Sequence, residues 1–243
     1  MGEGSPVSND RPLVTVISPT FGSPHLLRTR CIPSVEAQTY PNIEHLIVVN
    51  GGNQPPEENT PTRRIVHLGR DWNAFAPGTN GIIPVIAGST LARGKYIAYL
   101  DYDDEFQPQH VEKLVDLLES SGADWVYSQM AIIRQGKFWG QVIGGPKPAF
   151  GEISGQLLLH KAEMFNVANW DPKCEDNKAC LPQKWRKFAV YAADWDLIHR
   201  WVKSSAKWAH LPEVTVMHHR DSSAELEEWK AFLASGQYAT KAG

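Results

Sequence analysis

Apolar and polar positions along the first 130 residues fall into short blocks that predict strands and helices in turn. The strand blocks are apolar and rich in β-branched residues, and they span Leu13–Ser18, Glu44–Val49, Ile65–Leu68, Tyr96–Leu100 and Ala123–Gln129. The helix blocks between them begin at Pro24, at Ile82 and at Val111. This alternation is typical of an α/β protein with an open, mixed and mostly parallel sheet flanked by helices.

The helical pattern after Ser23-Pro24 places Leu27, Cys31 and Val35 on one face, and Pro33 is expected to kink or split that helix. After residue 130 the pattern is less regular. It predicts a helix from Trp185 to Lys203 and a strand at Val214–Met217. We therefore expect a single domain with two halves, 13–130 and 131–243, preceded by a flexible polar leader at 1–12.

Polar residues follow the predicted strands at the ends where they leave the sheet. Tyr96–Leu100 runs directly into Asp101-Tyr102-Asp103-Asp104, and the other strand ends carry Pro19-Thr20-Phe21 and Asn50. Ligands of parallel sheets bind at these carboxyl ends. Clustered carboxylates there indicate a divalent cation that holds phosphates. The alternative is a strand exit at which Asp side chains bond their own backbone.

Composition narrows the class of protein. The chain has 243 residues, a net charge of −3 and a pI near 6.3, which argue against a nucleic-acid binder or a polybasic membrane anchor. No apolar run approaches the roughly 18 residues of a membrane span. Three cysteines, an odd number that does not fit a disulfide framework, favour a reducing, cytoplasmic location, with Cys174 and Cys180 as free thiols rather than a shared metal site.

Four motifs, in order, resemble the family 2 glycosyltransferases of the GT-A fold. They are Val14–Phe21, Ser34–Asn42, Ala92–Asp104 and Ala193–Leu197, and the similarity extends over roughly Leu13 to Ser223. The resemblance implies a Rossmann-like GT-A domain that transfers a sugar, with inversion, from a nucleoside-diphosphate sugar to an acceptor hydroxyl. It makes 13–130 the half that binds the nucleotide sugar and 131–243 the half that binds the acceptor.

The resemblance also implies roles for single residues. Asp103 is expected to bind Mn²⁺ or Mg²⁺ directly, with Asp101 near the ribose or acting through water. Asp194 is expected to be the general base, although an acid in the first turn of a helix is also favourable beside the helix dipole. The residues expected to contact the donor are Pro19, Thr20, Phe21, Asn50, Asp101, Tyr102 and Asp103.

Two further residues are expected at the site. His219 is proposed as a third metal ligand, because its spacing from Ser222 fits the family better than that of His218, and the alternative is an exposed pair of histidines. Trp195, beside Asp194, is expected to stack on the acceptor, whereas core filling is the better interpretation for any other single Trp.

The chain departs from the family pattern at three places. Gly51 stands where relatives have an Asp that bonds the nucleotide base, and Ala193 stands where they have a Glu. Pro84–Ala87 takes the place of a segment that carries an Arg in relatives, so Arg70 or Arg93 would have to supply the missing positive charge. UDP is the first candidate for the donor nucleotide, with GDP and dTDP as alternatives. Two other functions remain open, a sugar-nucleotide nucleotidylyltransferase and a catalytically weak sugar-nucleotide-binding module.

Overall fold

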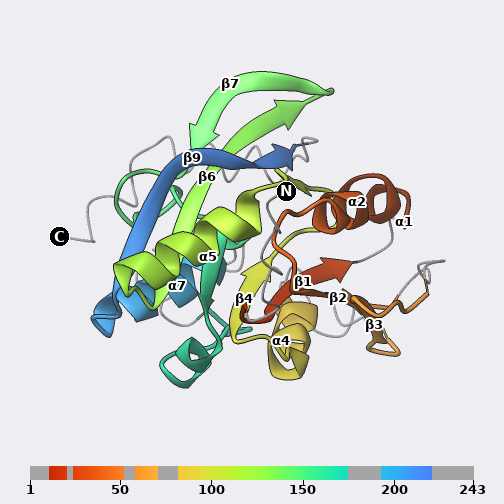
Figure 1. The fold of residues 1–243 in the computed structure, drawn as a ribbon, viewed down its shortest axis with the longest axis horizontal. Helices are drawn as coiled ribbons and strands as arrows, with labels where there is room; N and C mark the ends of the chain where they lie inside the picture. Colours follow the sequence, from red (N-terminus) through yellow and green to blue (C-terminus); the bar gives the residue numbers. More distant parts are fainter. Residues whose placement is uncertain (1–10, 21–23, 52–57, 71–81, 175–192, 221–243) are drawn as a thin grey trace, which may run out of the picture.

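One mixed sheet forms the centre of the protein (Figure 1). The computed structural model describes residues 11–20, 24–51, 58–70, 82–174 and 193–220. Within these residues the strands follow the spatial order β3-β2-β1-β4-β8-β6-β9-β5, and β7 pairs with β6 outside this row. The strands are β1 (Val14–Thr20), β2 (Ile43–Val49), β3 (Arg63–His67), β4 (Tyr96–Tyr99), β5 (Glu105–Phe106), β6 (Trp125–Arg134), β7 (Lys137–Ile143), β8 (Leu158–Lys161) and β9 (Trp208–His219).

The first half of the sheet is parallel, as the alternating pattern predicts. β1 pairs in parallel with β2 and β4, and β2 pairs in parallel with β3. Nearly every residue of β1, β2 and β4 is buried, which accounts for their continuous apolar sequences. Because parallel strands leave the sheet at the same edge, this arrangement brings Thr20, Asn50 and Asp101 together.

The second half of the sheet is mainly antiparallel, which the sequence pattern did not predict. β8 inserts antiparallel between β4 and β6, β7 forms a hairpin with β6, and β5 pairs antiparallel with β9. β6 and β9 pair in parallel and are both longer than predicted. β5 and β8 have only two and four residues, too few to give a recognisable period.

Helices lie in each of the predicted helical blocks, and residues 185–192 of the block predicted from Trp185 to Lys203 lie outside the described residues. The short 3₁₀ turns at Gly155–Leu157 and Ala162–Asn166 were not predicted. They comprise α1 (Pro24–Leu26), the π-helical η1 (Leu27–Cys31), α2 (Ile32–Glu36), α4 (Ile82–Leu91), α5 (His110–Ser121), the 3₁₀ turns η2 (Gly155–Leu157) and η3 (Ala162–Asn166), and α7 (Ala193–Lys203). α4 packs against β1 and β2, and α5 packs against β6, β8 and β9. α5 buries Leu114, Val115 and Leu118 and ends at Gly122, whose φ of 65° is the left-handed conformation that glycine favours.

Pro33 does not end the first helix. Leu27, Cys31 and Val35 are buried as predicted, and helical backbone continues from Pro24 to Glu36. The irregularity takes the form of the π-helical η1, which ends two residues before Pro33. A proline cannot donate to the preceding turn, and a wider turn is one way in which a helix accommodates it.

The end of the predicted leader is attached to the domain. Residues 1–10 lie outside the described residues, but Tyr40 donates its hydroxyl proton to the Pro12 carbonyl at 2.6 Å, and Arg11 pairs with Glu112 at 3.4 Å. The expectation of a flexible leader is therefore wrong for Arg11 and Pro12. In the described part of the chain, none of the helices has both the length and the apolarity needed to cross a bilayer.

Candidate active site

A cavity of about 400 Å³ opens at the carboxyl edge of β1, β2 and β4. Its wall gathers most of the site residues that the sequence predicts, from segments far apart along the chain. These residues are Pro19, Thr20, Asn50, Asp101, Tyr102, Asp103 and Asp194. The remaining wall residues were not predicted as site residues, namely Ile82, Pro84, Val85, Tyr99, Ser154, Gly155, Gln156, Trp170 and Ala193. Phe21 lies outside the described residues.

The two predicted donor-side carboxylates, Asp101 and Asp103, are half-buried and lie close enough for their charges to interact. Burial, and after it the neighbouring Asp104 and Asp103 charges, together raise the pKa of Asp101 to about 8. Burial likewise raises the pKa of Asp103 to about 6, and Asp104 contributes in the same direction. A cation placed between these groups would relieve both effects.

Asp104, which the sequence left without a role, is the fully buried member of the acidic cluster. Its Oδ2 accepts hydrogen bonds from His218 Nδ1 at 2.7 Å and Gln156 Nε2 at 3.2 Å, and its Oδ1 accepts one from the His219 backbone N–H at 2.9 Å. These contacts connect the end of β4 to the end of β9 and to η2. Asp104 therefore fixes the position of the segment that carries Asp101 and Asp103.

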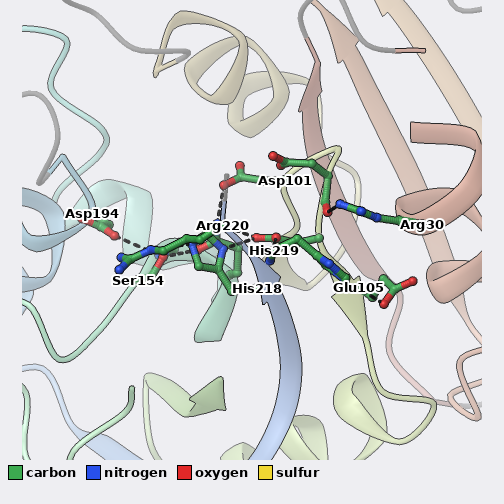
Figure 2. Close-up of polar contacts among 12 residues, drawn as sticks. Arg30, Asp101, Glu105, Ser154, Asp194, His218, His219 and Arg220 are labelled. Atoms are coloured by element: carbon green, nitrogen blue, oxygen red, sulfur yellow. Dashed lines mark hydrogen bonds and ion pairs between the residues drawn. The ribbon is translucent and has the colours of Figure 1, made fainter. Parts of the chain in front are cut away.

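Gln156 joins the donor-side carboxylates to Ser154, another residue of the cavity wall. Figure 2 shows Ser154 close to Asp194. Its amide N–H groups bond both Asp101 and Asp104, and its Oε1 accepts the hydroxyl of Ser154. The Ser154 hydroxyl also lies within bonding reach of Asp194, so its single proton serves one partner at a time. Gln156 and Ser154 belong to an irregular segment, and the sequence carries no local signal for them.

Asp194 lies in the first turn of α7, on the wall of the cavity. Its carboxylate accepts hydrogen bonds from the backbone N–H groups of Trp195 at 2.8 Å and Gly155 at 3.2 Å. Burial raises its pKa to about 6, although these hydrogen bonds oppose the shift. Asp196 is different, because it is buried and paired with Arg200 at 2.9 Å. Asp194 is thus the acid of α7 that faces the cavity.

The two histidines at the end of β9 point in different directions, as consecutive strand residues do. His218 bonds Asp104, and its Nε2 accepts a hydrogen bond from Arg220 at 3.3 Å. Burial lowers the pKa of His218 but the Asp104 charge and hydrogen bond oppose it, and the net shift is upward. His219 instead directs Nε2 to Glu105 at 3.1 Å. In the described part of the chain, no three His, Cys, Asp or Glu side chains are arranged to hold a metal by themselves.

The tryptophan next to the cavity is not the one predicted. Trp195 is absent from the cavity wall, and its ring stacks on His199 and meets Phe150 edge to face. Trp170 lines the cavity and donates its indole N–H to the Tyr99 hydroxyl at 3.1 Å. The predicted contact of Trp195 with an acceptor therefore finds no support in the cavity geometry.

A cation that contacts the segment of the acidic cluster was also not predicted. Arg30 donates to the Asp103 backbone carbonyl at 3.1 Å. Arg93, one of the two candidates from the sequence, instead lies before β4, where its backbone N–H bonds Glu44 at 3.2 Å. That position is at the opposite end of β4 from Asp101. Cys174 is buried and its thiol donates to the Asp171 carbonyl at 3.3 Å, and Cys180 lies outside the described residues.

The sequence comparisons identify the family. Residues 15–168 match the family model for glycosyl transferase family 2, so the chain belongs to this family, and its fold is the GT-A fold. It is 30% identical over 129 residues to an uncharacterized glycosyltransferase of Methanocaldococcus jannaschii, covering 49% of this chain and 43% of that protein. It is also 26% identical over 186 residues to glycosyltransferase GlyA of Streptococcus pneumoniae, and this alignment covers 65% of this chain and 26% of GlyA. The chain thus spans less than half of either relative.

Solved structures agree on the fold. The crystal structure of S. aureus TarS residues 1–349 superposes with a TM-score of 0.60 at 13% identity, covering 85% of this chain and 60% of that one. The same TarS fragment has been solved with UDP-GlcNAc. That structure has a TM-score of 0.56 at 14% identity, and the match covers 88% of this chain and 60% of the TarS chain. At this level of identity the likeness concerns the fold alone.

Replacing Gln156 by leucine tests the buried network. We expect Gln156→Leu to lower the free energy of unfolding by about 1–3 kcal/mol, because two buried carboxylates lose a donor. The matched control is Gln129→Leu, whose amide donates to the Gly144 carbonyl at 2.9 Å in a part-buried position away from the acidic cluster. Urea denaturation measures both. An equal or larger loss in the control would contradict the bridging role of Gln156.

Proposed function

We propose that this protein is an inverting glycosyltransferase that moves a sugar from a nucleoside-diphosphate sugar to an acceptor hydroxyl. The observation that carries the proposal is the single cavity lined by both Asp101 and Asp103 on one side and Asp194 on another. Family membership supports sugar transfer as the reaction class. The two groups of acids then divide the chemistry between the leaving group and the nucleophile.

Asp194 is the proposed general base. A sugar hydroxyl is a weak nucleophile until a carboxylate accepts its proton, and a base works best when its pKa lies near the working pH. The pKa of about 6 leaves Asp194 ionised near neutral pH while keeping it more basic than an exposed Asp. The proton moves from the acceptor hydroxyl to an Asp194 oxygen as the acceptor oxygen bonds the anomeric carbon and the diphosphate departs.

Asp103 and Asp101 are the proposed ligands of a divalent cation, Mn²⁺ or Mg²⁺. Their fit rests on the buried, mutually repelling carboxylates, which are hard oxygen donors suited to such ions. A bound cation would stabilise the charge that develops on the departing diphosphate. The His219 ring pairs with Glu105, so it would have to turn away from Glu105 to join these ligands.

UDP remains the first candidate for the donor nucleotide, with GDP and dTDP as alternatives. TarS residues 1–349 form crystal structures in complex with UDP and with UDP-GlcNAc, which supports UDP by analogy of fold. Asn50 lines the cavity, and an amide both donates and accepts, so it suits more than one base. The proposed acceptor is a compound that carries a hydroxyl group.

Changing Asp103 tests the cation site. We expect Asp103→Asn to abolish the Mn²⁺-dependent thermal stabilisation by nucleoside diphosphates, because an amide is a poorer ligand than a carboxylate. The folded state itself should remain. Asp116→Asn, at an exposed position on α5, is the control and should keep the full shift. Retention of normal Mn²⁺-dependent turnover by Asp103→Asn would refute the metal assignment.

Changing Asp194 tests the base. Asp194→Asn should lower kcat by roughly 10²-fold or more while nucleotide affinity stays near that of the wild type. A base acts only when deprotonated, so wild-type kcat should rise with pH through about 6, the pKa of Asp194, and level off above it. The residual rate of the variant should lack this rise. Unimpaired transfer by Asp194→Asn would assign the base to another group.

Gly51 tests base selection. We expect competition binding of UDP, GDP, dTDP and CDP to differ by less than about a hundredfold, or 2.7 kcal/mol, because the base-reading Asp is missing. Gly51→Asp should shift selectivity toward UDP. Gly51 has φ of 66°, which Asp tolerates better than most residues, and Gly69→Asp at φ of 73° is the control with the same strain. A wild-type preference for UDP beyond a hundredfold would contradict relaxed base reading.

A further inference from the structure

The hairpin formed by β6 and β7 carries the two most exposed large apolar side chains of the described residues, Phe138 and Trp139, together with the exposed Val142. The exposed fractions are 58% for Phe138, 59% for Trp139 and 45% for Val142. Among the described strands β7 pairs with β6 alone, and the hairpin projects from the top of the molecule in Figure 1. Six of the seven β7 residues are exposed. Scattered exposed apolar residues are normal, but three within five positions of one projecting strand indicate a binding surface.

Apolar side chains emerge from both faces of this hairpin. Phe138 and Trp139 are consecutive strand residues, so their rings point to opposite faces. A flat partner would cover one ring and leave the other in water. A bilayer interface can receive both, and Trp and Phe are residues that bind the apolar–polar boundary of a membrane.

The charge of the surrounding segment favours an anionic partner. Residues 125–151 contain Arg134, Lys137 and Lys147 and no Asp or Glu, although the whole chain has a net charge of −3. The Arg134 guanidinium lies 4.4 Å from the centre of the Trp139 ring, so cation and indole are presented together. The negative net charge of the whole chain argues against a polybasic anchor, but this segment by itself is positively charged. Anionic lipid headgroups attract such cations.

We propose that the β6–β7 hairpin, through Phe138, Trp139, Arg134 and Lys137, docks the protein on an anionic lipid bilayer surface. The hairpin is continuous with the sheet edge that carries the candidate site. Ile133 of β6 pairs with Phe138 on one side and with His219 on the other. Docking would therefore hold the end of β9, and the acidic cluster that it contacts, close to the membrane surface.

Vesicle binding by the full chain tests this inference. The probes are vesicles of phosphatidylcholine alone and vesicles with about 30% phosphatidylglycerol, an anionic lipid. We expect the wild type to co-sediment with the anionic vesicles, with a blue shift of Trp fluorescence, and to be released by high salt. The double variant Phe138→Ala/Trp139→Ala, and separately Arg134→Gln/Lys137→Gln, should each weaken partitioning by about tenfold or more.

Val167→Ala is the matched control, because Val167 is 49% exposed but lies at the end of η3, outside the hairpin. It should bind anionic vesicles as the wild type does, and circular dichroism should show all variants folded. Failure of the wild type to prefer anionic vesicles, or unchanged binding by both double variants, would overturn the proposal. Concentration-dependent self-association that the hairpin variants abolish, with no lipid binding, would identify a second copy as the partner instead. None of these readouts depends on glycosyl transfer.

Discussion

The buried carboxylate of Asp104 is the constraint on which the candidate site depends. A charged group without exposed surface is costly unless hydrogen bonds replace its water, and removing a partner costs several kcal/mol. Asp104 obtains its partners from His218, the His219 backbone and Gln156, which come from the end of β9 and from η2. Satisfying this one group therefore requires three remote segments to meet. These contacts fix the position of the segment that carries Asp101 and Asp103.

The sequence predicted the parts of the site that depend on local pattern. A buried strand that ends in polar residues can be recognised from a few consecutive positions in the sequence. Parallel pairing of such strands then brings Thr20, Asn50 and Asp101 to one edge of the sheet. Asp194 was predicted from a motif in its own helix. Gln156 and Trp170 could not be predicted in this way, because they reach the cavity only through the insertion of β8 between β4 and β6. That insertion is a tertiary event with no periodic signal.

The sequence also could not predict the direction in which the side chains of neighbouring residues point. Trp195 follows Asp194 directly, but neighbouring positions on a helix differ by about 100° in direction, so one lines the cavity while the other packs on Phe150 and His199. His218 and His219 show the same effect with the period of a strand. Adjacency in sequence supplied both candidates, whereas only the register of β9 on β6 decides which ring reaches Asp104.

Electrostatics connect these geometric points to the chemistry of the site. Burial disfavours the charged form of a carboxylate, and the three carboxylates at this strand end also repel one another, so the pKa values of Asp101 and Asp103 rise. Gln156 places amide N–H groups between Asp101 and Asp104, so part of the repulsion is relieved within the fold. The remaining negative charge is carried by Asp101 and Asp103, which line the cavity. Asp104 is buried, and hydrogen bonds from His218, the His219 backbone and Gln156 compensate its charge. The fold thus separates a structural carboxylate from two that retain a demand for positive charge, and that demand faces the cavity.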